Sequence, residues 1–102
     1  SLKSFEEVRE ELERTVREKG IVCFREVPDV TIPAIGVECS MALMVLKDQI
    51  DQVPVGSVIH LIAEGDESSE QEVMRWSQIT GHEIVDFFRE GRIVHALVRR
   101  KG

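Results

Sequence analysis

The sequence predicts an α/β (α+β) domain, a two-layer sandwich in which two helices lie on one face of a mixed four-stranded sheet. Three observations predict this fold. Apolar, strand-like segments alternate with segments of helical periodicity, and prolines or glycines break the chain between them. The last two strand-like segments flank Glu90-Gly91, a pair typical of a hairpin turn. The order βαβαββ favours a parallel strand pair with a right-handed crossover, followed by an antiparallel hairpin.

Length and composition are those of one compact globular domain. The chain has 102 residues, of which 42% are hydrophobic and 31% are charged, as is usual for a soluble protein. No segment reads as a signal peptide, and no apolar run approaches the roughly 18 to 20 residues that cross a membrane. We therefore expect a cytoplasmic protein.

The charge balance and the cysteine pattern argue against several classes of function. A formal net charge of -6 argues against nucleic-acid binding as the main activity, because affinity for the phosphate backbone depends on clustered lysines and arginines. Neither Cys23 nor Cys39 belongs to a CxxC motif or to a cluster of cysteines and histidines. The sequence therefore predicts no metal site and no cofactor.

The first segment, residues 1–29, is predicted to be a helix–strand extension of the main domain. Ser4 and Glu7 form a capping-box signature, Gly20 is a natural stop, and residues 21–27 resemble a short strand. Apolar residues recur at helical spacing and are expected to pack against the domain: Phe5, Val8, Leu12 and Val16.

The central segment predicts a strand over residues 30–37 and a helix over residues 40–53. Pro33 favours an edge position for the strand. The first half of the helix is apolar nearly all round, so some of its side chains must either pack against a second layer or form a docking surface. Packing is the simpler expectation for these residues, which are Met41, Met44 and Val45.

The last part of the chain predicts a buried strand over residues 57–63, a second helix and a hairpin. Ser69 and Glu72 form a capping box at the start of this helix, and Gly81 ends it. Trp76 shares a helical face with neighbouring apolar residues and is expected to anchor the helix in the core. The hairpin strands are predicted over residues 84–89 and 92–98.

Cys39 is the candidate reactive residue, because it lies where an apolar strand passes into a helix. A thiol at a helix N-terminus lies near unpaired backbone N–H groups and the positive end of the helix dipole, which lower its pKa and favour the thiolate. The same position also suits an inert, buried cysteine. Cys23, between two apolar residues of a predicted strand, is expected to be buried and to react slowly.

Three histidines and an acidic loop are weaker candidates for function. His60, His82 and His95 lie in or beside predicted strands, where a single histidine is more often packed than a ligand. His82 follows the helix-ending Gly81 and has the best claim to a local role. The acidic loop at residues 64–67 could bind a cation weakly or meet a basic partner, although a solvated loop is the simpler interpretation.

From about Ile32 to Lys101, the order of these features resembles the TusA/SirA-like family of small sulfur-carrier proteins. The resemblance rests on motifs in sequence order: Gly36-Val37-Glu38-Cys39, Pro54-Val55-Gly56, Trp76, Gly81-His82-Glu83, and Arg100-Lys101 after the hairpin. The family signature is G-L-x-C-P-x-P, and its cysteine carries sulfur as a persulfide. Cys39 matches that cysteine and Gly36 matches the glycine, whereas Ser40 and Ala42 stand in the places of both prolines.

The resemblance implies a TusA/SirA-like domain over residues 30–102 that relays persulfide sulfur on Cys39. Gly36, Glu38 and Ser40 would be the neighbours of the sulfur. Ser40 could cap the helix or donate a hydrogen bond to the sulfur. The implied partners are a sulfur-donor protein, such as a cysteine desulfurase or a rhodanese, and an acceptor protein. Neither a membrane nor nucleic acid is expected as a partner. The N-terminal extension could lengthen the sheet, form a homodimer or cover the surface at Cys39.

The loss of both prolines also permits a second function. A chain that kept the fold and lost the chemistry would be a non-catalytic interaction or regulatory module. Exposure and reactivity of Cys39 distinguish this module from a sulfurtransferase.

Overall fold

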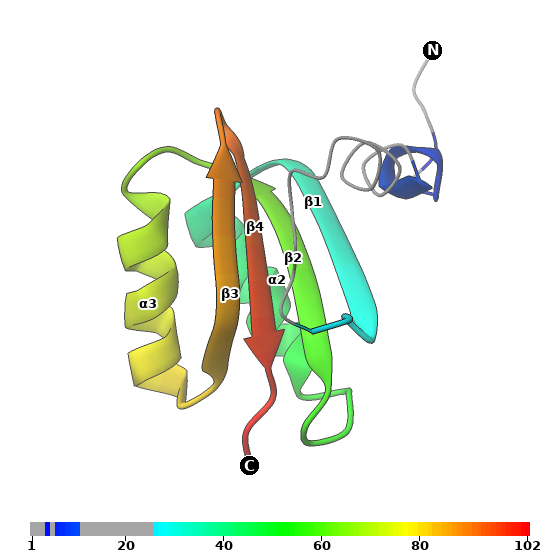
Figure 1. Cartoon of the computed structure of the whole chain (residues 1–102), viewed down its shortest axis with the longest axis vertical. Coiled ribbons are helices and arrows are strands. Elements are labelled where there is room, and N and C mark those ends of the chain that lie inside the picture. Colours follow the sequence, from blue (N-terminus) through cyan, green and yellow to red (C-terminus); the bar gives the residue numbers. More distant parts are fainter. Residues whose placement is uncertain (1–3, 5, 11–25) are drawn as a thin grey trace.

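The computed structural model describes Ser4, residues 6–10 and residues 26–102 (Figure 1). Within residues 30–102 every predicted helix and strand is present, with ends that differ by a few residues from those expected. The elements follow in the order β1 (Val30–Glu38), α2 (Cys39–Ile50), β2 (Val58–Glu64), α3 (Ser69–Thr80), β3 (Glu83–Glu90) and β4 (Ile93–Arg99).

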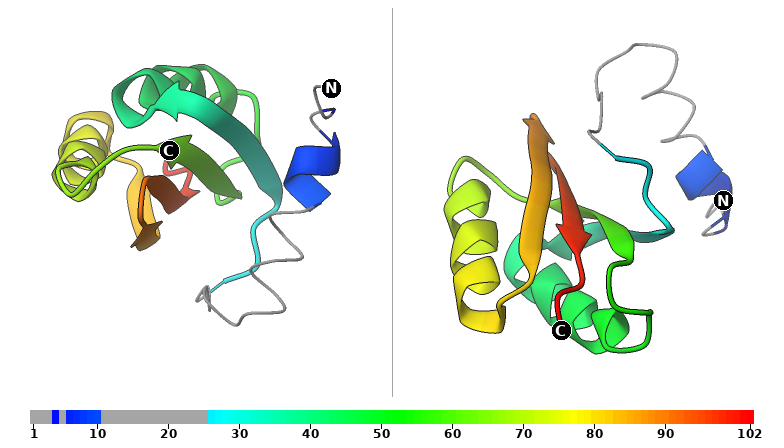
Figure 2. Two further views of the ribbon diagram at one scale, coloured as in Figure 1. Left: turned by 90° about the horizontal axis from the view of Figure 1, so that it is seen from above. Right: turned by 60° about the horizontal axis from the view of Figure 1, so that its bottom comes forward.

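The strands form one mixed sheet in the order β1-β2-β4-β3. β1 is parallel to β2, and β4 is antiparallel to both of its neighbours. Both helices lie in crossover connections, which place them on the same face of the sheet (Figure 2). The predicted two-layer α/β sandwich with a mixed four-stranded sheet is therefore confirmed.

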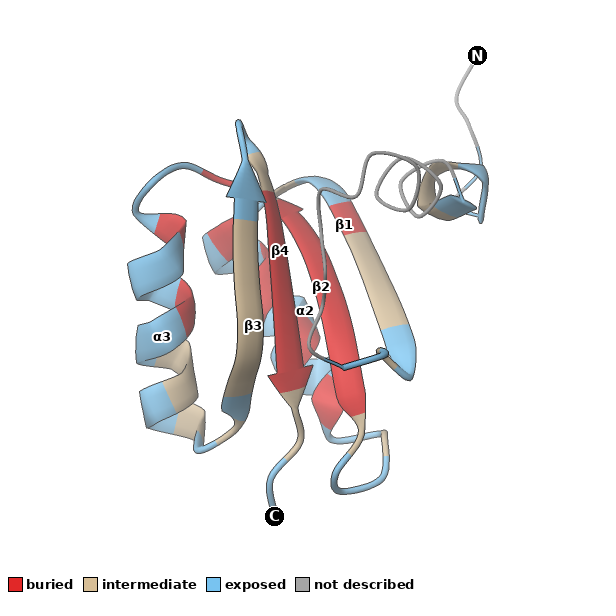
Figure 3. Cartoon of the chain, viewed as in Figure 1, coloured by how far each residue is buried: buried red, intermediate tan, exposed pale blue. Residues whose placement is uncertain are grey.

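The core fills the space between the helices and this face of the sheet. Successive strand residues point to opposite faces, so alternate residues of β2 and β4 meet the helices. The central strands are the most buried part of the sheet (Figure 3). The buried core includes Ile59, Leu61 and Ala63 of β2, Val94, Ala96 and Val98 of β4, Leu46 and Ile50 of α2, and Val73 of α3.

The opposite face of the sheet carries a pair of buried histidines. His60 of β2 and His95 of β4 are 5% and 3% exposed, and their Nε2 and Nδ1 atoms lie 2.9 Å apart. Burial lowers the pKa of His60 to about 3, with the nearby His95 as the second cause, and burial also lowers the pKa of His95. Both rings therefore stay neutral at physiological pH, and the expectation that they are packed residues is confirmed.

The outward sides of the helices differ from the prediction. Met41, Met44 and Val45 are 57%, 63% and 41% exposed, so the expectation that they pack against a second layer is wrong. The sheet contacts only one side of α2, and a 12-residue helix cannot bury its whole circumference against one sheet and one neighbouring helix. On α3, Trp76 is only partly buried at the edge of the core, and Ile79 is 77% exposed.

Part of the N-terminal extension can be compared with the prediction. Residues 6–10 are helical, and the Oγ atom of Ser4 accepts a hydrogen bond from the backbone N–H of Glu7 at 3.2 Å, as the capping signature predicts. Glu26 and Val27 are not in a strand, contrary to expectation. The other predictions fall outside the described residues; they concern Phe5, Leu12, Val16, Gly20, residues 21–25 and Cys23. In the part of the chain that the structure describes, no helix has the length and apolar character to cross a membrane.

Candidate functional site

Cys39 lies at one edge of the sheet, where distant parts of the chain meet. β1 ends at Glu38 and α2 begins at Cys39, so the predicted strand–helix junction is confirmed. Because β1 and β2 are parallel, their carboxyl ends reach the same edge, and both helices begin there (Figure 1). The tip of the β3–β4 hairpin, which includes Arg92, reaches the same place.

Gly36 sets the path of the chain into this junction. Pro33 pairs with Ile62 and Glu38 with Glu64, so β1 uses more residues than β2 between these two pairs. Within this irregular stretch Gly36 has a φ of +83°, a left-handed conformation that side chains with a Cβ atom rarely adopt. Gly36 therefore acts through the backbone, by directing Glu38 and Cys39 toward the start of α2.

Ser69 is the side chain that hydrogen-bonds the thiol, although its position in the sequence predicted a cap for the second helix. Its hydroxyl hydrogen-bonds the thiol of Cys39 and accepts a hydrogen bond from the backbone N–H of Asp66 at 3.1 Å. The predicted capping box is wrong, because Ser69 is the first helical residue, the N-cap is Ser68, and no side chain caps α3. The sequence marks Ser69 only as a polar residue at a helix start. It does not indicate the contact with Cys39, because the two residues are thirty positions apart.

Gly65 allows Ser69 to approach. A Cβ atom on Gly65 would lie 1.9 Å from the Oγ of Ser69 and 3.1 Å from the side chain of Val94. The backbone N–H of Gly65 donates to the carbonyl oxygen of Arg92 at 2.8 Å, which joins this loop to the hairpin tip. The acidic loop thus holds Ser69 against Cys39.

Glu38 and Ser40, the predicted neighbours, flank the thiol without contacting it through hydrogen bonds. Glu38 forms an ion pair with Arg92 at 2.9 Å, but both side chains are about three-fifths exposed, so the pair contributes little to stability. Ser40 is exposed, and α2 has no side-chain cap. The expectation that Ser40 caps the helix is therefore wrong, because Glu38 occupies the N-cap position.

The electrostatics of the site keep the thiol protonated. Cys39 is 2% exposed, and burial is the main reason that its pKa is raised from 9.0 to about 11. The Glu72 carboxylate is the second cause, the hydrogen bond from Ser69 lowers the pKa in part, and Glu38 and Asp66 raise it further. The expected lowering of this pKa is therefore wrong for the resting protein, because desolvation and the surrounding carboxylates prevail.

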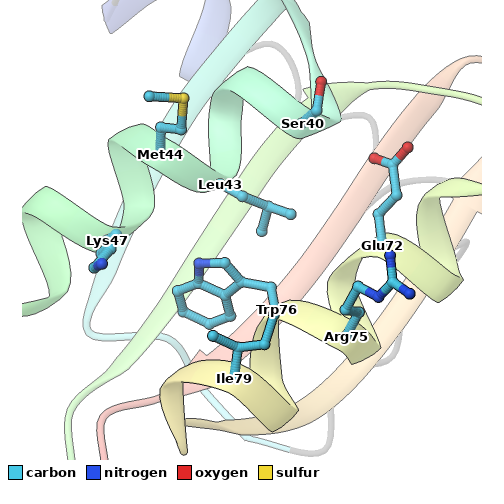
Figure 4. Close-up of a pocket in the computed structure, with 8 residues that line it drawn as sticks. All are labelled: Ser40, Leu43, Met44, Lys47, Glu72, Arg75, Trp76 and Ile79. Carbon is cyan, nitrogen blue, oxygen red and sulfur yellow. The ribbon is translucent and has the colours of Figure 1, made fainter.

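A groove between the two helices begins beside Cys39. We call it the α2–α3 groove; it has a volume of about 290 Å³. Leu43 and Trp76 point toward each other across it, and Ser40 and Glu72 lie at the end near the thiol (Figure 4). The groove is lined by Ser40, Leu43, Met44, Lys47, Glu72, Arg75, Trp76 and Ile79.

The histidines lie apart from Cys39. His82 follows the far end of α3, about 18 Å along the helix axis from its start. There its Nδ1 accepts a hydrogen bond from the backbone N–H of Lys101, and its ring packs against Trp76, so its local role is structural. His60 and His95 lie on the opposite face of the sheet and cannot serve as a base for the thiol. Among the described residues, no group of three or more histidine, cysteine or acidic residues could hold a metal ion.

Comparisons with known proteins identify a family that matches most of the chain. The family model described as "Sulfurtransferase TusA" matches residues 30–100, which include Cys39 and extend from β1 through β4. A protein of Archaeoglobus fulgidus with the name "Putative sulfur carrier protein" is 34% identical to this chain over 61 residues. That match covers 60% of this chain and 82% of the archaeal protein.

Proposed function

Since this chain belongs to the TusA family, we propose that it is a sulfur carrier in which Cys39 holds the transferred sulfur as a persulfide. The observation that carries the proposal is the position of Cys39 at the strand–helix junction, inside the matched residues. Proteins of this kind work with other proteins in sulfur relay. The relay would begin with a donor such as a cysteine desulfurase or a rhodanese and end with an acceptor protein.

The transfer step needs no external oxidant. The Cys39 thiol first loses its proton, and its sulfur attacks the outer sulfur of a donor persulfide. A new S–S bond forms at Cys39, the S–S bond of the donor breaks, and the donor cysteine leaves as a thiolate that takes up a proton. Delivery repeats the exchange, with the acceptor as nucleophile and the Cys39 thiolate as leaving group.

The Ser69 hydroxyl and the start of α2 would assist this exchange once a donor reaches the thiol. The hydroxyl of Ser69 stabilises negative charge on the sulfur, since its hydrogen bond lowers the thiol pKa. Backbone N–H groups at the start of α2 add a positive potential in the same place. Gly36 and Gly65 fix the backbone that brings these groups together.

Two observations favour the second candidate, a non-catalytic interaction module. Cys39 is buried and its pKa is raised to about 11, which leaves roughly one thiol in a few thousand ionised at pH 7.5. Ser40 and Ala42 also stand in place of the prolines of the family signature. In this second function the α2–α3 groove would bind a partner and Cys39 would remain a packed, unreactive residue.

Persulfide loading of cysteine variants distinguishes the two functions. The reduced protein is incubated with glutathione persulfide, and intact mass is recorded for the wild-type chain, Cys39→Ser and Cys23→Ser. The sulfur-carrier function predicts the gain of one sulfur atom in the wild-type chain and in Cys23→Ser, and no gain in Cys39→Ser. Dithiothreitol should remove the added sulfur. Loading that survives Cys39→Ser, or a wild-type chain that never gains sulfur, supports the interaction module instead.

A further inference from the structure

The α2–α3 groove is an apolar surface that the described residues leave uncovered. Met44 and Ile79, on its two sides, are 63% and 77% exposed. Its volume of about 290 Å³ lies at the lower limit for sites of small organic ligands, and it suits one or two side chains of a protein partner.

The charges along the groove are arranged asymmetrically. Glu72 lies at the end near Cys39 and is the carboxylate that most strongly affects the thiol, while Lys47 lies at the opposite end (Figure 4). Arg75 lies about one turn beyond Glu72 on α3. Within the described part of the chain, neither Lys47 nor Arg75 has an ion-pair partner. A complementary partner would place positive charge at the thiol end of the groove.

We propose that the α2–α3 groove is the docking surface for the sulfur-donor protein, which inserts an apolar side chain beside Leu43 and Trp76 and presents an arginine or lysine to Glu72. This inference rests on the proposed sulfur-carrier function and names the partner chemistry of the same site. The apolar contact supplies affinity, and the charge contact places the donor at Cys39.

The reaction that occurs at Cys39 explains why the donor carries the cation. Loading requires the resting thiol to lose its proton, and the carboxylates around it oppose that loss. A cationic side chain beside Glu72 offsets the negative charge that raises the thiol pKa most, and it therefore favours the thiolate. The thiol thus reacts faster when the donor docks, and stays largely protonated and slow to react in its absence.

Short synthetic peptides test the docking surface without knowledge of the natural donor. The probe contains leucines and arginines, and two matched peptides replace the arginines by glutamates or the leucines by serines. Binding to the full chain carrying Cys23→Ser is followed by amide chemical shifts, and thiol activation by the rate of iodoacetamide alkylation of Cys39 at pH 8. The leucine–arginine peptide should shift amide signals of the groove and accelerate alkylation several-fold, whereas the matched peptides should not accelerate it.

Two equally exposed residues provide a matched pair of variants. Met44→Asp, in the groove, should abolish the acceleration, whereas Val55→Asp, outside the groove, should leave it unchanged; both native side chains are 63% exposed. Acceleration that survives Met44→Asp, peptide shifts confined to other surfaces, or no acceleration at all would overturn the docking proposal. Loading of Cys39 by glutathione persulfide in the wild-type chain, measured without any peptide, separates a failure of docking from a failure of the sulfur-carrier function.

Discussion

The hydroxyl of Ser69 hydrogen-bonds the thiol of Cys39 and thereby joins the first residue of α3 to the first residue of α2. Neither helix start has a side-chain cap of its own. The polar group expected to cap α3 is used to support a thiol on the neighbouring helix. Four consequences of this arrangement and of the buried histidine pair in the sheet can be measured.

Ser69→Ala should make Cys39 less reactive and the fold less stable. The hydrogen bond that lowers the thiol pKa would be lost, and the backbone N–H of Asp66 would lose its acceptor. The free energy of unfolding should fall by about 1 to 2 kcal/mol. The pH dependence of alkylation and urea denaturation check the two effects. Ser68→Ala serves as the control, because the Ser68 hydroxyl bonds Asp66 and not the thiol; equal reactivity of Ser69→Ala and wild type would refute the role of Ser69.

Glu72→Gln should make Cys39 more reactive in the absence of any partner. Removal of this carboxylate lowers the thiol pKa, because Glu72 is the largest electrostatic cause of its elevation. The stability of the protein should change by no more than about 0.5 kcal/mol, since Glu72 is exposed. Alkylation rates at several pH values measure the effect. Glu70→Gln, an exposed substitution on the same helix, should react like wild type; an identical rate increase in both variants would show a general effect of net charge.

Gly65→Ala should destabilise the protein by about 1 to 3 kcal/mol, because the new methyl group would overlap the Oγ of Ser69. The cost is steric, since Gly65 is not among the glycines with positive φ. Combining this change with Ser69→Ala should recover part of the loss, as the overlapping oxygen is then absent. Thermal or urea unfolding of the two single variants and the double variant measures the coupling, and strictly additive losses would contradict a direct clash.

Stability should decrease as the pH falls below 6.5, because the buried His60 resists protonation. Its pKa is about 3 in the folded protein and 6.5 when unfolded, so the unfolded chain binds more protons between these values. The contribution of neutral His60 to the free energy of unfolding is therefore complete above pH 6.5 and is lost toward pH 3. At pH 5 the free energy of unfolding should be lower by about 2 kcal/mol. His95, whose pKa is also lowered, adds to the same trend.

Urea denaturation at pH 7.5 and at pH 5 measures this loss. The variant His82→Asn keeps the buried pair and should show the same decrease. Equal stability of the wild-type chain at the two pH values would show that the histidines are protonated in the fold without penalty.

Local patterns were sufficient to predict most of the fold. Helical periodicity, strand-like apolar runs and the breaks at Pro54 and Gly81 located every element within residues 30–102, and the position of Cys39 followed from two of them. The contacts around the thiol were not predictable in this way. Ser69 reaches Cys39 only because two crossover connections place both helix starts at one edge of the sheet.

Burial was the property that local patterns predicted least well. A cysteine at a helix start has the same sequence pattern whether it is exposed or buried, and here Cys39 is 2% exposed and hydrogen-bonds Ser69 at the start of α3. Met44 was expected to be packed, but it is 63% exposed and the described residues form no second layer on its side of α2. A position at a helix start is therefore not sufficient to predict the direction of the thiol pKa shift, because desolvation and the nearby carboxylates decide it here.

The measurement that most directly tests Cys39 as the sulfur-bearing residue is localisation of the added sulfur in the unmodified chain. The protein is loaded with glutathione persulfide, alkylated, digested and sequenced by tandem mass spectrometry. The expected result is one additional sulfur atom on the peptide that contains Cys39, with Cys23 recovered only as the simple alkylated thiol. Sulfur found on Cys23 alone, or on neither cysteine, would contradict the sulfur-carrier function.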